Sequence, residues 1–472
     1  MEALKAPLPA NAPPGRHILI EPGSYPNTGF RSTSDFVLTA VEGLGSVTLD
    51  GRTVGTIEVT GKVTLQGLIV RNWSDEGLAL EVDKGTIVAE QCEFMTRGRI
   101  AVRASKAANL TLRDCDVQEG AVVYSASYGL MEGTSVSGTK GNAVAIRSGS
   151  ALTLRSCRIA DTGGHGIWAT EGSKPVIEKC TITDAAESGI RVDDRAEAVL
   201  RDCGIHNSGR TSLAAVEKGG VTADDCRITG AGVTGLWVAA GGSLTARRVR
   251  TESSKSTGVV IEKGVALLED CEVAGAGANG VYLARDSDVT IIRGTITDAE
   301  MVGVELDDGS RGRMEGTTIT GSRLAAVSVE AGGDLDIRGC TLADNRGRGI
   351  LTCLGSSVRI EDLTSVRNGK RDWYDFDLEA AKARAAKPEP AEPEGGAPAE
   401  APAEAPAGAD AAPPSTEGDG DTSADALLAR LDAMIGLAAV KREIRKLTNL
   451  QKVAEKRRLA GLPPGPRIGR HM

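Results

Sequence analysis

The strongest constraint on the fold of this chain is a repeat of 23 residues. Four cysteines recur at this interval, each followed two positions later by isoleucine: Cys157, Cys180, Cys203 and Cys226, with Ile159, Ile182, Ile205 and Ile228. The same frame continues in both directions to give 14 units, marked by Gly67, Cys92, Cys115, Thr134, Arg248, Cys271, Gly294, Thr317, Cys340 and Leu363. A fixed period of this length indicates a repeat architecture.

A second recurring position lies about nine residues after each cysteine position and contains glycine followed by an apolar residue, as in Gly166-Ile167 and Gly189-Ile190. Between these positions, runs of three to five residues alternate apolar and polar side chains and are bounded by Gly, Asp, Asn and Ser, which predicts short strands. No unit has room for a helix of about ten residues. If each unit is one turn of a coil, stacking at about 4.8 Å makes a rod roughly 65 Å long.

The cysteine column fits the interior of such a coil, because a free cysteine behaves as a small buried hydrophobe. An odd cysteine count and a stacked column favour reduced thiols over disulfides. Leucine-rich and helical repeats would need a Leu framework or helical periodicity, which are absent. From about His17 to Phe376 the pattern resembles the right-handed parallel β-helix of the pectin-lyase-like superfamily, in its short-repeat branch of periplasmic copper-protein and carbohydrate-processing type.

We therefore expect an all-β fold, a right-handed parallel β-helix solenoid, with further segments at both ends. The predicted segments are a flexible lead-in (1–16), the parallel β-helix (17–376), a helical cap (377–387), a disordered acidic Pro/Ala-rich linker (388–424) and an α-helical segment (425–472). The linker is too poor in apolar residues to bury a core. The helical spacing of Leu427, Leu431 and Ile435 supports the last segment.

That last segment contains LDAMIGLAAVKREIRKLTNLQKVAEKRRLAGLPPGPRIGRHM and resembles the lead-in of AAA+ ATPases of the rubisco-activase and stage V sporulation protein K group. The resemblance implies that Ile435, Gly436 and Leu437 form the adenine side of a nucleotide pocket. The phosphate-binding loop of that group is absent from the sequence, so we expect no ATP hydrolysis by this chain. ATP and Mg²⁺ are expected only if an AAA+ core follows in this chain or is supplied by a partner chain, and otherwise no cofactor or metal is expected.

The formal net charge is −9, and no basic stripe runs along the repeats, so nucleic acid is an improbable partner. The sequence has no basic-plus-apolar leader and no run of 18 apolar residues. We therefore expect a cytoplasmic protein without a membrane partner.

The histidines and acids of the repeats are the candidates for catalytic residues. Gly164-His165-Gly166 is similar to an element of polygalacturonases, and Asp193-Asp194, Asp224-Asp225 and Asp307-Asp308 are paired carboxylates of the kind used in acid/base chemistry. In that family the aspartates precede the histidine and an Arg-Ile-Lys segment follows, which is not the order here. Turn chemistry accounts for the same residues, so no catalytic residue is assigned and no calcium site is expected.

The outward position of the Gly-Ile-x-Val strand predicts a ligand-binding face instead. Successive turns place there Trp168, Arg191, Ala214 or Ala215, Trp237, Val260, Tyr282 and Glu305. Exposed aromatic rings with interspersed charges suit a sugar or a peptide, although bulky residues also suit any exposed strand.

These observations favour a non-catalytic binding or scaffold module whose face selects a protein or glycan, tethered to an AAA+ unit. The alternative is a polysaccharide-active enzyme, a lyase, hydrolase or epimerase, on the same face. A third possibility is a structural solenoid without a ligand. A cluster of Asp with Arg or Lys on adjacent turns would favour the enzyme.

Overall fold

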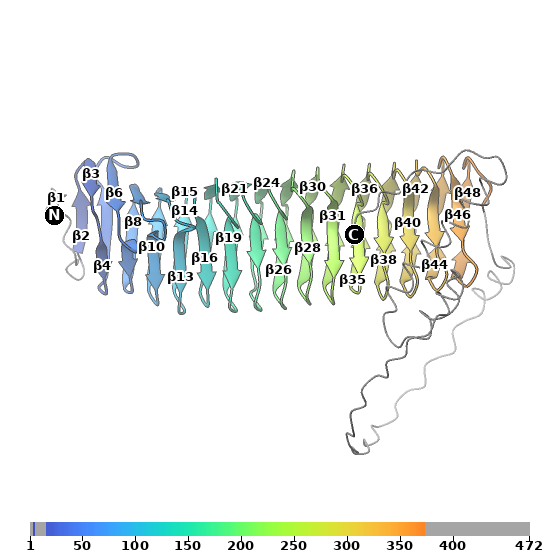
Figure 1. Ribbon diagram of the computed structural model, residues 1–472, viewed down its shortest axis with the longest axis horizontal. Coiled ribbons are helices and arrows are strands. Elements are labelled where there is room, and N and C mark those ends of the chain that lie inside the picture. The colour runs from blue at the N-terminus through green and yellow to red at the C-terminus, as the bar shows by residue number, and fades with distance from the viewer. Residues whose placement is uncertain (1–2, 5–15, 373–472) are drawn as a thin grey trace, which may run out of the picture. The chain divides into compact units, whose positions relative to one another are not determined.

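The computed structural model describes residues 3–4 and 16–372, which form strands β1 to β48 and no helix. They coil into a right-handed parallel β-solenoid of about 15 turns with about 23 residues in each turn (Figure 1). The expected fold class is therefore confirmed. The cap, the linker and the AAA+-like segment lie outside the described residues.

Each turn contributes one strand to each of three parallel sheets, which we call A, B and C in the order in which the chain visits them. Sheet A contains β1 (Ala3–Leu4), β2 (Arg16–Ile20), β5 (Phe36–Ala40), β8 (Lys62–Gln66), β11 (Thr86–Glu90), β14 (Asn109–Arg113), β17 (Tyr128–Glu132), β20 (Ala151–Arg155), β23 (Val176–Glu178), β26 (Glu197–Arg201), β29 (Gly220–Asp224), β32 (Ser243–Arg247), β35 (Val265–Glu269), β38 (Asp288–Ile292), β41 (Arg311–Glu315), β44 (Asp334–Arg338) and β47 (Ser357–Glu361).

Sheet B contains β3 (Gly23–Pro26), β6 (Val47–Gly51), β9 (Leu68–Asn72), β12 (Glu93–Thr96), β15 (Asp116–Gln118), β18 (Ser135–Ser137), β21 (Arg158–Thr162), β24 (Thr181–Ala185), β27 (Gly204–His206), β30 (Arg227–Thr229), β33 (Arg250–Glu252), β36 (Glu272–Ala274), β39 (Thr295–Thr297), β42 (Thr318–Thr320), β45 (Thr341–Ala343) and β48 (Thr364–Val366).

Sheet C contains β4 (Phe30–Ser32), β7 (Gly55–Val59), β10 (Leu78–Asp83), β13 (Ile100–Ser105), β16 (Ala121–Ser125), β19 (Val144–Arg147), β22 (Ile167–Ala169), β25 (Ile190–Val192), β28 (Thr211–Ala215), β31 (Thr234–Ala239), β34 (Val259–Glu262), β37 (Val281–Leu283), β40 (Val302–Leu306), β43 (Ala325–Val329) and β46 (Arg348–Thr352).

The inward side chains of all three sheets form one apolar core that runs along the coil. Eight of the nine cysteines are buried, Cys353 is half-buried, and all nine are free thiols. The interior thiols donate to backbone carbonyls, as Cys203 Sγ does to Ile177 O and Arg201 O, both at 3.3 Å. Burial raises the pKa of Cys271 to about 11, which keeps this thiol protonated.

The repeat frame needs two corrections, because the buried residues are Leu68 and Val249 rather than the expected Gly67 and Arg248. The corner between sheets C and A is one residue shorter after β34 than after β31, so the interval from Val249 to Cys271 is 22 residues. Gly67 and Arg248 lie instead at the corner between sheets A and B, with φ of 68° and 51°.

The outer face of sheet A is a charge ladder, in which one outward residue per turn alternates between acid and base. We call the following residues the sheet-A ladder: Glu90, Arg113, Glu132, Arg155, Glu178, Arg201, Asp224, Arg247 and Glu269. Arg155 lies 3.4 Å from the carboxylates of both Glu132 and Glu178. Each base thus meets an acid on an adjacent turn.

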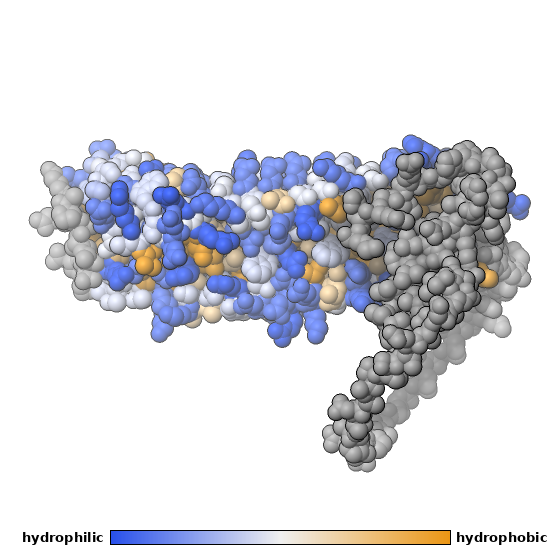
Figure 2. Space-filling view, in the orientation of Figure 1, coloured by the Kyte–Doolittle hydropathy of each residue, from blue (hydrophilic) through white to orange (hydrophobic). Residues whose placement is uncertain are grey.

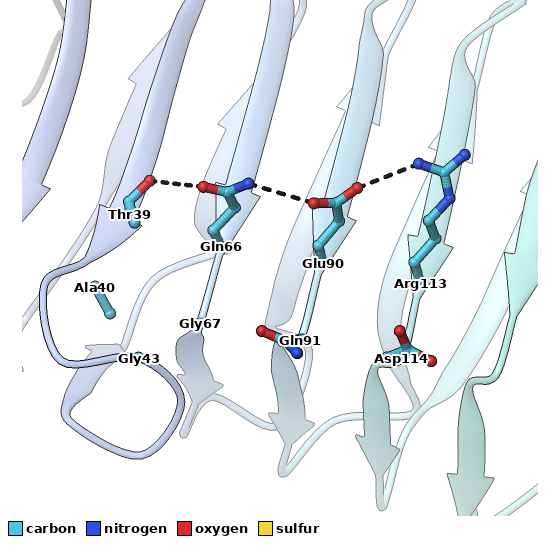
Figure 3. A pocket seen from close by; sticks show the side chains of 9 residues that line it. All are labelled: Thr39, Ala40, Gly43, Gln66, Gly67, Glu90, Gln91, Arg113 and Asp114. Carbon is cyan, nitrogen blue, oxygen red and sulfur yellow. Dashed lines mark hydrogen bonds and ion pairs between the residues drawn. The ribbon is translucent and has the colours of Figure 1, made fainter.

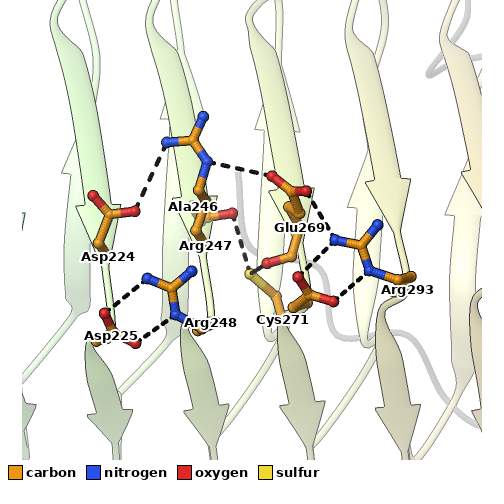
Figure 4. Close-up of polar contacts among 9 residues, drawn as sticks. Asp224, Asp225, Ala246, Arg247, Arg248, Glu269, Cys271 and Arg293 are labelled. Atoms are coloured by element: carbon orange, nitrogen blue, oxygen red, sulfur yellow. Dashed lines mark hydrogen bonds and ion pairs between the residues drawn. The ribbon is translucent and has the colours of Figure 1, made fainter.

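A second line of charges follows the neighbouring corner, where Arg248 donates to Asp225 and Arg293 donates to Asp270 through two nitrogens each, at 2.6 to 2.8 Å (Figure 4). The surface in view is mostly hydrophilic with small apolar patches (Figure 2). Within residues 16–372, no helix could span a membrane.

Candidate functional site

The structure places all five residues of the expected ligand-binding face in one row on the outside of sheet C. Parallel pairing aligns Trp168, Arg191, Ala214, Trp237, Val260, Tyr282, Glu305 and Ser328 on consecutive turns. Ala214 rather than Ala215 occupies the row. We call these eight residues the sheet-C row. Trp168 and Tyr282 reach acids at the corner where sheet C turns into sheet A, whereas Glu305 bonds Asn279 at the corner where sheet B turns into sheet C.

The two tryptophans of the row are half-buried rather than fully exposed, because each lies on small neighbours. Trp168 packs against Ala145, Val123 and Ala121, and Trp237 packs against a separate group of alanines and a valine. Three turns separate the two rings, which corresponds to about 14 Å. Half-buried rings on the outside of a sheet offer apolar surface for contact with an extended ligand.

Asp193 holds two residues of the row, Trp168 and Arg191, in place at its N-terminal end. It is 5% exposed and accepts hydrogen bonds from the indole of Trp168 at 3.0 Å and from Arg191 Nε at 2.6 Å. Burial alone would raise the pKa of Asp193, but hydrogen bonds from Thr170, Arg191 and Trp168 outweigh it and hold the pKa below its usual value. Asp193 therefore positions its neighbours and is shielded from a ligand.

His165 lies at the corner next to this anchor, with both ring nitrogens engaged. Its Nδ1 accepts the backbone N–H of Ser188 at 3.1 Å, and its Nε2 lies 3.2 Å from Glu187. Burial is the main cause that lowers the pKa of His165, so the neutral ring is favoured at neutral pH. The neutral tautomer set by Ser188 carries its hydrogen on Nε2 and donates it to Glu187.

A second cluster surrounds Glu305 at the C-terminal end of the row. Glu305 accepts a short hydrogen bond from the Asn279 side-chain amide, whose oxygen accepts the Val302 N–H at 3.2 Å. Tyr282 donates its hydroxyl hydrogen to Asp307 Oδ2 at 3.2 Å, and Asp308 N–H donates to the other oxygen at 2.9 Å. Two carboxyl groups, each with its own orienting partners, therefore lie on one strand and the corner that follows it.

The electrostatics of this cluster differ from those of the rest of the surface. Burial first, and then the charges of Glu330 and Asp307, raise the pKa of Glu305, although the Asn279 hydrogen bond opposes this. Burial and the neighbouring acids also raise the pKa of Tyr282 to about 12. Glu305 is thus biased toward its protonated form while Asp307 is held as a hydrogen-bond acceptor.

No Lys or Arg forms an ion pair with Glu305, Asp307 or Glu330 within residues 16–372. The same part of the chain contains no group of three or more His, Cys, Asp or Glu side chains arranged to hold a metal ion. The cluster combines a carboxyl group whose pKa is raised with a second carboxyl group that accepts two hydrogen bonds, an arrangement suited to proton transfer.

Sequence reasoning selected Tyr282 and Glu305 but missed Asn279 and Glu330, and assigned Asp307 to turn chemistry. The missing residues lie in the corners, where the two-residue alternation stops. For Glu330 the sequence does contain a signal: it follows Asp307 by 23 residues, one repeat, so the two residues are neighbours on consecutive turns.

A family model described as "Right handed beta helix region" matches residues 117–249 and 234–371. No curated protein matches the chain. The match ends before the AAA+-like segment, which lies outside the described residues together with Ile435, Gly436 and Leu437; the nucleotide-binding assignment stays a prediction.

Solved structures similar to this chain include a glucanase and two epimerases. The catalytic unit of the GH87 alpha-1,3-glucanase from Streptomyces thermodiastaticus strain HF3-3 is 16% identical with a TM-score of 0.39, over 76% of this chain and 63% of that chain. The periplasmic alginate epimerase AlgG is 13% identical with a TM-score of 0.37, over 75% and 78%. The A-module of the mannuronan C-5 epimerase AlgE4 from Azotobacter vinelandii is 12% identical with a TM-score of 0.35, over 75% and 90%. At these values the likeness concerns the fold alone.

The expectation of a non-catalytic binding module tethered to an AAA+ unit is not borne out: the similar structures named above are described as a glucanase and as epimerases, and they resemble this chain in fold only. The cluster expected of an enzyme, Asp with Arg or Lys on adjacent turns, is present only in part: Arg191 pairs with Asp193 on its own turn and with Glu217 on the next turn. The alternative expectation, a polysaccharide-active enzyme, replaces it.

Proposed function

Because the chain belongs to the family of right-handed beta-helix regions, whose coil aligns one outward side chain per turn, we propose that sheet C carries the active site of a glycoside hydrolase for an uncharged polysaccharide. The observation that carries the proposal is the pair Glu305 and Asp307, two carboxyl groups on one surface in different environments. Paired carboxyl groups of opposite protonation are the chemical requirement for glycoside hydrolysis.

Glu305 acts as the general acid in this proposal. Its raised pKa keeps a proton available for the leaving glycosidic oxygen, and the Asn279 amide orients the carboxyl group. Asp307 acts as the second carboxylate, which activates water or stabilises positive charge on the sugar ring. The Tyr282 hydroxyl holds Asp307 through the hydrogen bond of 3.2 Å.

The charges favour an uncharged substrate at the reacting sugar. A lyase or an epimerase of a uronate must stabilise the negative charge that develops beside the sugar carboxylate, which a cation does well. Here the groups around Glu305 are Asp307 and Glu330, with no ion-pairing cation within residues 16–372. These acids would repel a uronate.

Trp237 lies three turns from Glu305 in the sheet-C row, and Trp168 lies six turns away. At about 4.8 Å per turn, these separations are roughly 14 and 29 Å, so one extended polymer would contact both rings and the acid cluster. The rings would bind the polymer by stacking, which places the scissile bond without contributing to proton transfer.

A second candidate is a lyase or epimerase at the other end of the row. It is favoured by Arg191, which could neutralise a uronate carboxylate, close to the neutral ring of His165. The lone pair of His165 Nδ1 already accepts the Ser188 N–H, so the imidazole would have to release Ser188 before it could accept a substrate proton. Action on oligouronates would support this candidate.

The test is release of reducing ends from uncharged glucans, with alginate and polygalacturonate as charged comparisons. Glu305→Gln should lower kcat about 10²- to 10⁴-fold, the usual contribution of general acid catalysis. The matched control is Glu300→Gln, an exposed acid paired with Arg323 outside the row. Equal rates for the two variants would remove Glu305 from the proposal.

A further inference from the structure

A hollow of about 480 Å³ opens on the outside of sheet A near the N-terminal end of the coil, away from the sheet-C row (Figure 3). Thr39, Gln66, Glu90 and Arg113 line it from four consecutive turns, and Gln91 and Asp114 line it from the adjoining corner. This volume lies within the usual range for small-ligand sites, about 300 to 1,000 Å³.

The hollow exists because one connection is unusually long. Residues 41–46 join β5 to β6, whereas the single residue Gly67 makes the same corner one turn later. A Cβ at Gly67 would lie 3.1 Å from both Gly43 C and Leu44 N, so the loop closely overlies this corner. Gly67 also has a φ of 68°, which favours glycine.

The sheet-A ladder changes its chemistry at this place. Beyond Glu90 the alternation of charges stops, and an amide and a hydroxyl continue the line. Thr39 donates to Gln66 Oε1 at 3.1 Å, Gln66 Nε2 donates to Glu90 at 3.3 Å, and Arg113 donates to Glu90 at 3.2 Å. This chain of hydrogen bonds holds the side chains in one orientation over the hollow (Figure 3).

The hydrogen-bonding capacity that remains is mixed. Gln66 uses one of its two amide hydrogens, and Glu90 uses one lone pair on each oxygen. The side chains of Gln91 and Asp114 make no hydrogen bond with the part of the chain that the structure describes. The hollow thus presents donors and acceptors together, with two acids and one base.

We propose that this hollow is a saccharide-binding site for a neutral sugar unit. Sugar hydroxyl groups both donate and accept hydrogen bonds, which matches amide, carboxylate and guanidinium groups in one wall. Glu90 and Asp114 would repel phosphate or a uronate. Pre-oriented side chains lower the entropic penalty of binding, since the ladder already fixes Gln66, Glu90 and Arg113.

The site is separate from the proposed active site, because it lies on another sheet and on other turns. It would hold a second segment of a glycan chain, or a free oligosaccharide, while sheet C is occupied. The inference does not depend on hydrolysis: a chain that cleaves nothing could still bind sugar here.

The experiment measures binding of fluorescently labelled cello- and nigero-oligosaccharides to the full chain, with labelled oligomannuronate as the charged probe. All variants carry Glu305→Gln, so that the probes remain intact. Asp114→Ala should weaken binding of a neutral probe about tenfold, and Gln91→Ala severalfold, as expected for lost charged and uncharged hydrogen bonds. Neither side chain stabilises a neighbour by a hydrogen bond, but both Gln91 and Asp114 have positive φ (49° and 48°), as Asp202 has (52°). The thermal midpoint of Asp114→Ala should therefore fall no further than that of Asp202→Ala.

The matched control is Asp202→Ala, at the same corner four turns farther along the coil. A further arm, Trp237→Ala, reports binding on sheet C. The proposal is overturned if Asp114→Ala binds like Asp202→Ala, if only Trp237→Ala reduces binding, or if neither neutral probe binds. Failure of the proposed hydrolase would appear separately, as absence of bond cleavage.

Discussion

Sheets A and C are built from the same repeat, yet they use charge in opposite ways. On sheet A every base of the ladder meets an acid on an adjacent turn, and its side chains stay in water. At the C-terminal end of the row on sheet C, three acids lie together without a base, and one of them has a raised pKa. Pairing with arginine lowers the pKa of acids such as Glu178 and Glu269 and keeps them ionised, whereas burial and neighbouring acids raise the pKa of Glu305, which favours proton transfer.

The difference shows why a count of charged residues would not locate the site. Sheet A is the more highly charged face, but its charges neutralise one another turn by turn. Exposed pairs of this kind contribute little each, although a network contributes more than an isolated pair. The informative features are an acid without a basic partner, Glu305 on sheet C, and the point at Gln66 where the charge alternation of sheet A ends.

The largest expected effect is on activity, when one acid is neutralised on each sheet. Asp307→Asn should reduce kcat/KM about 10²- to 10⁴-fold, because it removes the second carboxylate of the proposed pair. Asp225→Asn, which removes an acid bonded to Arg248 near the sheet-A ladder, should leave kcat/KM unchanged. Comparable losses in both variants would abolish the functional distinction between the sheets.

The next effect is on stability and concerns the buried ion pair of sheet C. Asp193→Ala should lower the free energy of unfolding by about 2 kcal/mol, because Arg191 and the Trp168 indole lose their acceptor in a covered site. Asp225→Ala on the exposed corner should change it far less. Chemical denaturation of the two variants measures the contrast, and equal midpoints would contradict it.

A smaller effect is expected on the pH profile. Catalysis needs protonated Glu305, so activity should fall as pH rises through the raised pKa of this group. Glu330→Gln removes one of the charges that raise this pKa, so the alkaline limb should move to lower pH by less than about one unit. A limb that moves to higher pH, or an unchanged one, would show that Glu330 does not influence the acid.

The smallest effect is expected from the sheet-A side. Hydrogen bonds from Arg293 are the main cause that lowers the pKa values of Glu269 and Asp270 in the folded protein. The stabilisation of the fold by these pairs is therefore complete above the unfolded pKa values near 4, and it is lost as pH falls through the lower folded values. Arg293→Ala should therefore lower Tm slightly at neutral pH and hardly at all in strong acid.

Salt provides the control for this last variant, because added ions screen exposed pairs. The Tm difference between Arg293→Ala and the wild-type protein should shrink as salt is added. Arg285→Ala, an exposed arginine without an ion pair within residues 16–372, should show little difference at any salt concentration. A salt-independent loss in Arg293→Ala would indicate packing rather than charge.

Much of the coil could be predicted from the sequence, since its period is carried by residues that face inward. The cysteines and the Gly-Ile marks locate strands, and alternation then assigns Trp168, Trp237 and Glu305 to the outside of one sheet. The frame was misplaced by one residue at Gly67 and Arg248, because corners of different length shift the count without disturbing the strands.

The acid cluster was harder to predict, because its partners come from corners. Asp307 and Asn279 flank strands rather than lie in them, and a corner aspartate usually serves its own turn. What brings them together is pairing between β37 and β40, which the alternation within one turn does not describe. The sheet-A ladder does have a signal in the sequence. Arg113, Arg155 and Arg201 each stand two residues before a cysteine, and an acid occupies the same position on the turns between them. The pattern emerges only when every second turn is compared.

The parallel pairing of sheet C also makes the solenoid a ruler. Every separation along the row is a whole number of turns, so the distance between Trp237 and Glu305 can change only in steps of about 4.8 Å. Removal of one complete repeat between them would shorten the gap by one step and leave both side chains pointing outward. Gain or loss of repeats would thus change the length of sugar chain that spans the two residues, while the residues themselves stay the same.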